Sequence, residues 1–130
     1  MILDTSFLID LMDHDAEAIA CLHSLQRRGE PLLITTPTIF ELFTGLARST
    51  KPIQERTKIM NLLQGQMIIP FEQNAAEKAG DIDGTLLKAG SAIGPIDSMI
   101  GGIALMRKEK VVTRNVKDFS RITGLGIETY

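Results

Sequence analysis

The chain has 130 residues, and its 14 basic and 16 acidic side chains leave a net charge of −2 at pH 7. This length supports one hydrophobic core, so residues 1–130 are predicted to form a single domain. The slight negative charge argues against a protein that coats nucleic acid by bulk electrostatics. Cys21 is the only cysteine, which excludes an intrachain disulfide and a thiolate metal site.

The sequence contains no apolar run that approaches the roughly 20 residues needed to cross a bilayer. A signal peptide is also not expected, because a carboxylate, Asp4, follows directly after the first three residues. We therefore expect a cytoplasmic protein with no membrane segment.

Short β-prone runs alternate along the chain with stretches that repeat apolar residues at helical spacing. The predicted elements are, in order, a strand at 1–3, helices at 6–12 and 15–28, a strand at 32–35, helices at about 37–48 and 52–63, a strand at 67–69, helices at 72–89 and about 95–108, a strand at 111–113 and a short strand around Ile127. This alternation is typical of βαβ units, so the predicted fold class is α/β, with a short, mainly parallel sheet covered by helices.

Four acids follow or lie near the carboxyl ends of the predicted strands, the edge of an open α/β sheet where ligands bind. They are Asp4, Glu41, Asp97 and Asp118. Glu41 and Asp97 lie in strongly apolar surroundings that are unusual for a solvated acid. Carboxylates that converge in one cleft repel one another unless protons or a cation neutralise them. Without nearby cysteine or histidine, such oxygen donors favour Mg²⁺ or Mn²⁺.

Each acid also has a structural interpretation of its own. Asp4 fits a helix N-cap, and Thr38 with Glu41 matches a capping box. Asp97 can complement a helix dipole in the first turn, and Asp118 can be a surface acid that opens a turn. The shared location at one sheet edge favours the functional interpretation, since four independent caps would not require it.

Four segments of the sequence resemble, in order and spacing, the PIN-domain nucleases, and among them the VapC-type toxins of prokaryotic toxin–antitoxin pairs. The segments are the opening Ile-Leu-Asp-Thr-Ser at 2–6, Thr-Pro-Thr-Ile-Phe-Glu-Leu at 36–42, Pro-Ile-Asp-Ser-Met-Ile-Gly at 95–101 and Thr-Arg-Asn-Val-Lys-Asp-Phe at 113–119. The resemblance spans essentially the whole chain. It implies a PIN-like α/β/α sandwich, a Mg²⁺- or Mn²⁺-dependent endoribonuclease acting on RNA, a homodimer and inhibition by a cognate antitoxin.

The resemblance also implies roles for individual residues. Asp4, Glu41 and Asp97 match the main metal-binding acids, and Asp118 matches a more variable fourth. Polar positions that line the site are matched by Thr5, Ser6, Thr113 and Asn115. Turn and cap chemistry is an equal alternative for Ser6 and Asn115. Arg114 and Lys117 are candidates for contacting RNA phosphate, with free surface charges as the alternative.

The sequence also allows other functions. Residues 81–85, Asp-Ile-Asp-Gly-Thr, spell a phosphatase signature, but the helix-forming residues before them contradict the buried strand that this signature requires. A non-catalytic PIN-like domain that binds RNA or a partner is one alternative, and a DNA-directed nuclease is another. The Gly101-Gly102 pair inside a predicted helix indicates close backbone packing near Asp97.

Overall fold

The computed structural model describes residues 1–130 and contains a five-stranded sheet with the order β3-β2-β1-β4-β5. All neighbouring strands are parallel. The strands are β1 (Ile2–Leu3), β2 (Leu33–Thr35), β3 (Met67–Ile69), β4 (Val111–Val112) and β5 (Ile127–Glu128). The short parallel sheet confirms the predicted fold class, and the strand around Ile127 is present.

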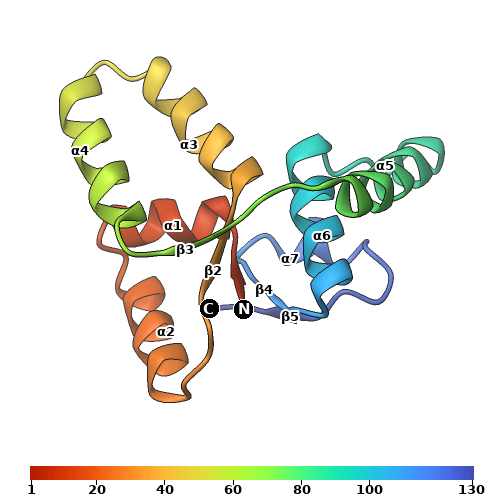
Figure 1. Ribbon diagram of the computed structural model, residues 1–130, viewed down its shortest axis with the longest axis horizontal. Coiled ribbons are helices and arrows are strands. Elements are labelled where there is room, and N and C mark those ends of the chain that lie inside the picture. Colours follow the sequence, from red (N-terminus) through yellow and green to blue (C-terminus); the bar gives the residue numbers. More distant parts are fainter.

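Seven helices connect these strands (Figure 1). They are α1 (Thr5–Met12), α2 (Ala16–Arg27), α3 (Thr36–Ala47), α4 (Pro52–Leu63), α5 (Gln73–Lys88), α6 (Pro95–Arg107) and α7 (Val116–Phe119). None of them is long and apolar enough to span a membrane.

Alternate residues of the strands point to two separate cores, as expected for a sheet buried on both faces. Ile2, Leu33 and Val111 pack with residues of α5, α6 and α7. Their neighbours Leu3 and Ile34, together with Val112, pack with residues of α1 to α4. The chain is therefore a three-layered α/β/α sandwich, with α1 to α4 on one face of the sheet and α5 to α7 on the other.

The two central glycines of α6 allow close packing of this helix, as the sequence predicted. A Cβ atom on Gly102 would lie 2.8 Å from the backbone oxygen of Ala75 in α5, and one on Gly101 would collide with the side chain of Ile122. Because a larger residue at Gly102 would meet backbone, α5 and α6 can approach only with glycine there. The close contact fixes the helix whose first turn carries Asp97.

Two local alternatives are excluded by the helix boundaries. The helix α3 begins at Thr36, one residue before the expected Pro37, and its N-cap is Thr35 rather than Thr36. Thr38 therefore lies inside the first turn, and the capping box with Glu41 does not form. Residues 81–85 lie within α5, without the preceding strand that a phosphatase motif needs.

Candidate active site

The carboxyl ends of β1 and β4 lie side by side, although the chain runs from β1 to β2 and reaches β4 only after four further helices, α3 to α6, and β3. The strand order reverses at this point, which is where open α/β sheets bind ligands. Asp4 directly follows β1, and Thr113 directly follows β4. The topology thus places these two residues next to each other at the expected edge.

Asp4 is both a helix cap and a buried member of the site. One carboxylate oxygen accepts a hydrogen bond from the backbone N–H of Phe7 at 2.8 Å, and the hydroxyl of Ser6 lies 2.9 Å from both oxygens. Burial raises the pKa of Asp4, while hydrogen bonds from Thr113, Phe7 and Ser6 lower it. The cap role proposed for Asp4 is real, and it orients the carboxylate rather than replacing a functional role.

Asp97 lies in the first turn of α6 and has the most perturbed carboxylate of the cluster. Loss of solvation is the largest cause, and it raises the pKa of Asp97 to about 7. Repulsion from the carboxylates of Glu41, Asp4 and Asp118 adds to this rise. All four predicted acids therefore lie near enough to interact electrostatically.

Asn115 connects two of these acids. Its side-chain amide nitrogen donates to Asp118 at 3.0 Å and to Asp97 at 3.3 Å. Its backbone N–H donates to the hydroxyl of Thr113 at 2.8 Å. Asn115 thus joins the loop after β4 to α6 and α7, which is more than the turn chemistry that offered an alternative for this residue.

The predicted polar residue Thr5 belongs to a cluster of three buried threonine hydroxyls that the sequence did not predict. Its hydroxyl lies 3.2 Å from that of Thr38, which in turn lies 3.3 Å from the hydroxyl of Thr35. Thr35 and Thr38 are fully buried. These contacts tie the start of α1 to the start of α3, the helix that carries Glu41.

The basic residues near the site differ in their surroundings. Arg121 was not predicted, yet it lies 3.9 Å from Asp118 and donates to the carbonyl of Ser91. Arg121 lies in the turn after α7, three residues beyond Asp118, and its backbone N–H donates to the carbonyl of Asp118 at 3.1 Å. Lys117 is exposed and forms no ion pair, whereas Arg114 contacts acids of the first two helices.

The donor set fits a hard divalent cation. Asp4, Glu41, Asp97 and Asp118 offer carboxylate oxygens. Burial is the main cause of the raised pKa of Asp97, and the repulsion from the other three acids that adds to it is what a cation would relieve. In this structure no three of the acids lie close enough to form a closed metal site. The four side chains lie at one edge of the sheet, but they do not converge on one metal-binding position.

Residues 1–125 match the PIN domain family, and the chain belongs to this family. It is similar to the tRNA(fMet)-specific endonuclease VapC of Salmonella typhimurium, with 31% identity over 99 residues that cover 76% of this chain and 75% of that protein. It is also similar to ribonuclease VapC1 of Haemophilus influenzae strain R2866, with 32% identity over 125 residues, or 95% and 92% of the two chains.

Solved structures support the same relationship. VapBC2 of Rickettsia felis, bound to a DNA fragment from its promoter, has a TM-score of 0.88 at 26% identity and covers 99% of this chain and 97% of that one. DNA-bound VapBC of Salmonella typhimurium has a TM-score of 0.85 at 30% identity, with 98% and 96% coverage. Within the PIN-domain family, the chain is a VapC-type toxin.

Proposed function

We propose that this chain is a divalent-metal-dependent endoribonuclease and the toxin of a VapBC-type toxin–antitoxin pair. The observation that carries this proposal is the cluster of Asp4, Glu41, Asp97 and Asp118 at the strand-order reversal. Burial, together with repulsion from the other three carboxylates, raises the pKa of Asp97 in this cluster to about 7. A folded chain that keeps such repulsion gains from a cation at this place. The relatives named as endonuclease or ribonuclease support a nuclease reaction.

The four acids would hold Mg²⁺ or Mn²⁺, and Asp118 also lies 3.9 Å from the basic side chain of Arg121. Bound there, such an ion would activate water and stabilise the charge that develops on a phosphodiester during in-line displacement. Ser6 and Thr113 hold the Asp4 carboxylate in a fixed orientation by hydrogen bonding. Asn115 does the same for Asp97 and Asp118.

We propose RNA, single-stranded or structured, as the substrate class. The name of the Salmonella relative specifies a tRNA, which supports RNA over DNA. On this chain Lys117 is an exposed cation in α7, one residue before Asp118, and no carboxylate pairs with it. It remains our candidate for contacting RNA phosphate. The cytoplasm, where cellular RNA is found, is the location that this proposal implies.

An antitoxin is the proposed protein partner, and a groove between α1, α3 and α4 is suited to receive part of it. This groove has a volume of about 340 Å³, and its walls include Ile9, Met12, Leu42 and Ile59, with Glu41 also lining it. An apolar segment bound there would reach one of the site acids. The solved neighbours are VapBC toxin–antitoxin complexes, which supports a partner of this kind.

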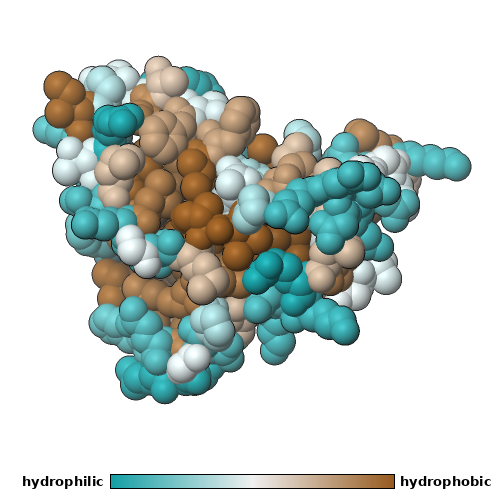
Figure 2. All heavy atoms as spheres, in the orientation of Figure 1, coloured by the Kyte–Doolittle hydropathy of each residue, from teal (hydrophilic) through white to brown (hydrophobic).

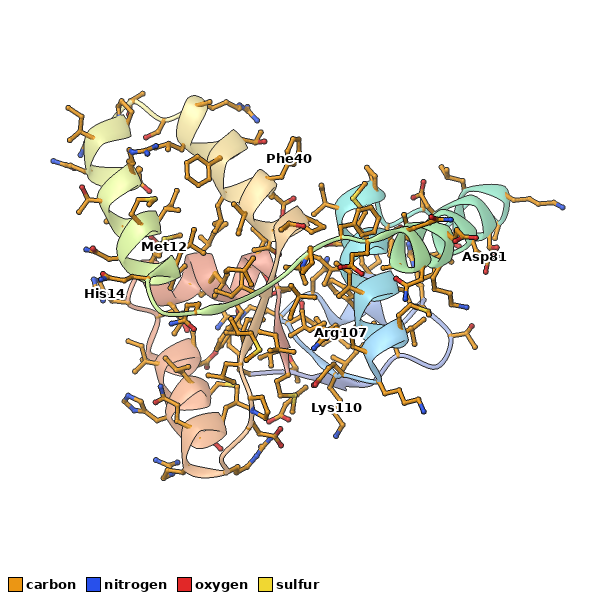
Figure 3. The ribbon with its side chains drawn as sticks, in the orientation of Figure 1. Met12, His14, Phe40, Asp81, Arg107 and Lys110 are labelled. Carbon is orange, nitrogen blue, oxygen red and sulfur yellow. The ribbon has the colours of Figure 1, made fainter.

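A homodimer is proposed from the apolar surface beside α3. Apolar atoms gather on the face between the α3–α4 hairpin and α5 (Figure 2). Phe40 is 65% exposed and projects from the side of α3 that is turned toward α6, where it lines a pocket with Phe71 and Ile96 (Figure 3). Light scattering at micromolar concentrations should show a dimer that Phe40→Glu dissociates, and a monomeric wild type would contradict this.

The function itself is tested by incubating the purified protein with RNA in Mg²⁺, in Mn²⁺ and in EDTA. Cleavage is expected with either ion and should stop in EDTA. Cleavage that continues undiminished in EDTA would overturn the metal dependence. Binding of RNA without any cleavage in either ion would favour a non-catalytic PIN-like domain, and preferential cleavage of DNA would favour a DNA-directed nuclease.

A further inference from the structure

The loop after β4 contains an arginine, Arg114, whose guanidinium contacts three acids. One terminal nitrogen of Arg114 lies 3.1 Å from both Asp15 and Glu17, and the other lies 3.5 Å from Asp10. These acids lie in α1, at the N-cap of α2 and in the first turn of α2. Arg114 therefore ties this loop to the corner between the first two helices.

An aromatic ring completes the surroundings of Arg114. The guanidinium carbon lies 4.6 Å from the centre of the Tyr130 ring, a distance suited to a cation–π contact. The Tyr130 hydroxyl donates to Asp10 at 2.6 Å, and its ring meets that of Phe7 edge to face at 4.9 Å. Burial and the Asp10 carboxylate raise the pKa of Tyr130, so the hydroxyl stays protonated and keeps donating.

The neighbours of Arg114 in the sequence contact the candidate active site. Thr113 hydrogen-bonds with Asp4, and Asn115 donates to Asp97 and Asp118. The three consecutive residues 113–115 thus connect two groups of acids, with Arg114 holding one group and its neighbours holding the other. Any shift of the Arg114 backbone would move Thr113 and Asn115 together.

The same contacts argue against Arg114 as a residue that binds the phosphate of the RNA substrate. A phosphate would have to compete with three carboxylates and a cation–π contact for this guanidinium, of which one terminal nitrogen already donates to both Asp15 and Glu17. Lys117, which has no such partners, is free to take that role. Any effect of Arg114 on the active site would therefore come from its hold on the loop that carries Thr113 and Asn115, and not from a direct contact with substrate.

We propose that Arg114, held by Asp10, Asp15, Glu17 and Tyr130, is a positioning residue that sets where Asn115 and Thr113 hold the metal-binding acids. This inference rests on the proposed metal-dependent nuclease function and concerns how that site is held in shape. Tyr130 acts in turn on Arg114 and Asp10, so the cluster extends from the last residue of the sequence to the loop that follows β4.

The test compares Arg114→Ala, Arg114→Lys and Tyr130→Phe with a matched control, Arg28→Ala. Arg28 is equally exposed, at 43% against 42% for Arg114, and pairs with Glu128 and Glu30 instead. Mn²⁺ affinity is measured by electron paramagnetic resonance without RNA, and kcat and KM are measured with RNA. Exposed ion pairs contribute little to stability, so these variants should remain folded, and thermal melts check this.

Arg114→Ala should weaken Mn²⁺ binding about tenfold, as for other residues that orient metal ligands, and should lower kcat more than it changes KM. Arg114→Lys should recover only part of the loss, because an ammonium lacks the planar fork. Tyr130→Phe keeps the ring and loses only the hydroxyl, so a smaller decrease in Mn²⁺ affinity is expected. Arg28→Ala should match the wild type.

Different results separate failure of this inference from failure of the proposed function. Unchanged Mn²⁺ affinity in both Arg114→Ala and Tyr130→Phe, with a raised KM for RNA in the former, would make Arg114 a substrate contact and overturn the inference. An equal loss in Arg28→Ala would overturn it as well, since any lost ion pair would then suffice. A wild type that binds no Mn²⁺ and cleaves no RNA would instead overturn the proposed function.

Discussion

Two groups of acids lie on either side of residues 113–115, and they differ in how their charge is neutralised. The outer group, Asp10, Asp15 and Glu17, shares Arg114. Within it the pKa of Asp15 is lowered, mainly by the backbone N–H of Ala18 and also by Arg114. In the inner group, which we define as Asp4, Glu41, Asp97 and Asp118, the pKa of Asp97 is raised to about 7.

The two groups differ in whether the fold itself neutralises their charge. Asp15 caps α2 and all three outer acids contact the Arg114 guanidinium, so their charge is already used to hold helices together. The inner acids have only Arg121, at 3.9 Å from Asp118, as a basic partner. Charge that the fold neutralises is explained by the fold, whereas charge that it leaves uncompensated points to a ligand.

Removing the most perturbed inner acid should have the largest effect. Asp97→Asn should lower RNA cleavage by more than about 100-fold, because a direct metal ligand matters at least as much as the residues that orient it. Its control is Asp81→Asn, an acid on the outer part of α5 (Figure 3), which should cleave like the wild type. Full activity in Asp97→Asn would remove Asp97 from the site.

Thermal melts should distinguish the two groups by their response to metal. Mg²⁺ at a hundredfold excess over its Kd should stabilise the wild type by about 2.7 kcal/mol, and Asp97→Asn should lose most of this gain. In EDTA that variant should be as stable as the wild type or more so, because one repelling charge is gone. A variant that is less stable in EDTA, with a full Mg²⁺ shift, would make Asp97 a structural helix acid.

The response to pH should also differ between the groups. Between the unfolded value of 3.8 and about 7, folded Asp97 binds more protons than unfolded Asp97. Its contribution to the free energy of unfolding in EDTA should therefore fall as pH rises through this window. Asp15 has a lowered pKa and should do the opposite, contributing stability above its unfolded value and losing it as pH falls.

Metal binding should follow the same titration. Below pH 7 protons compete for Asp97, so the apparent Mn²⁺ affinity should fall by up to about tenfold per pH unit. The measurement is Mn²⁺ titration of the wild type and of Asp81→Asn from about pH 5.5 to about pH 8, which spans roughly one unit on either side of the pKa of Asp97. A flat profile in the wild type would contradict the coupling, while Asp81→Asn should follow the wild-type profile.

The smallest effect is expected from the hydroxyl that orients Asp4. Ser6→Ala removes hydrogen bonds to both carboxylate oxygens and should reduce cleavage by up to about tenfold. The backbone bond from Phe7 remains, so Asp4 keeps most of its orientation. Thr57→Val, which removes an exposed hydroxyl on α4, should leave cleavage unchanged. Equal losses in both variants would show that Ser6 has no special role.

Much of the fold follows from local patterns. The period-two alternation of Ile2 and Leu3, and of Val111 and Val112, separates the two cores, and helical spacing identified each long helix. Because strand ends of a parallel sheet share one edge, the sequence also predicted that the four acids gather there. The likeness to PIN-domain nucleases, carried by four separate segments, is borne out by the family match.

Only the tertiary structure decided how individual polar side chains are used. Local spacing allowed a capping box between Thr38 and Glu41, but the helix starts earlier and Thr38 instead meets Thr5, 33 residues away. Arg114 was expected as a free or RNA-binding charge, yet its partners Asp15 and Glu17 lie 99 and 97 residues away. Period and cap chemistry act over a few residues, whereas such pairings depend on how the crossovers bring distant helices together.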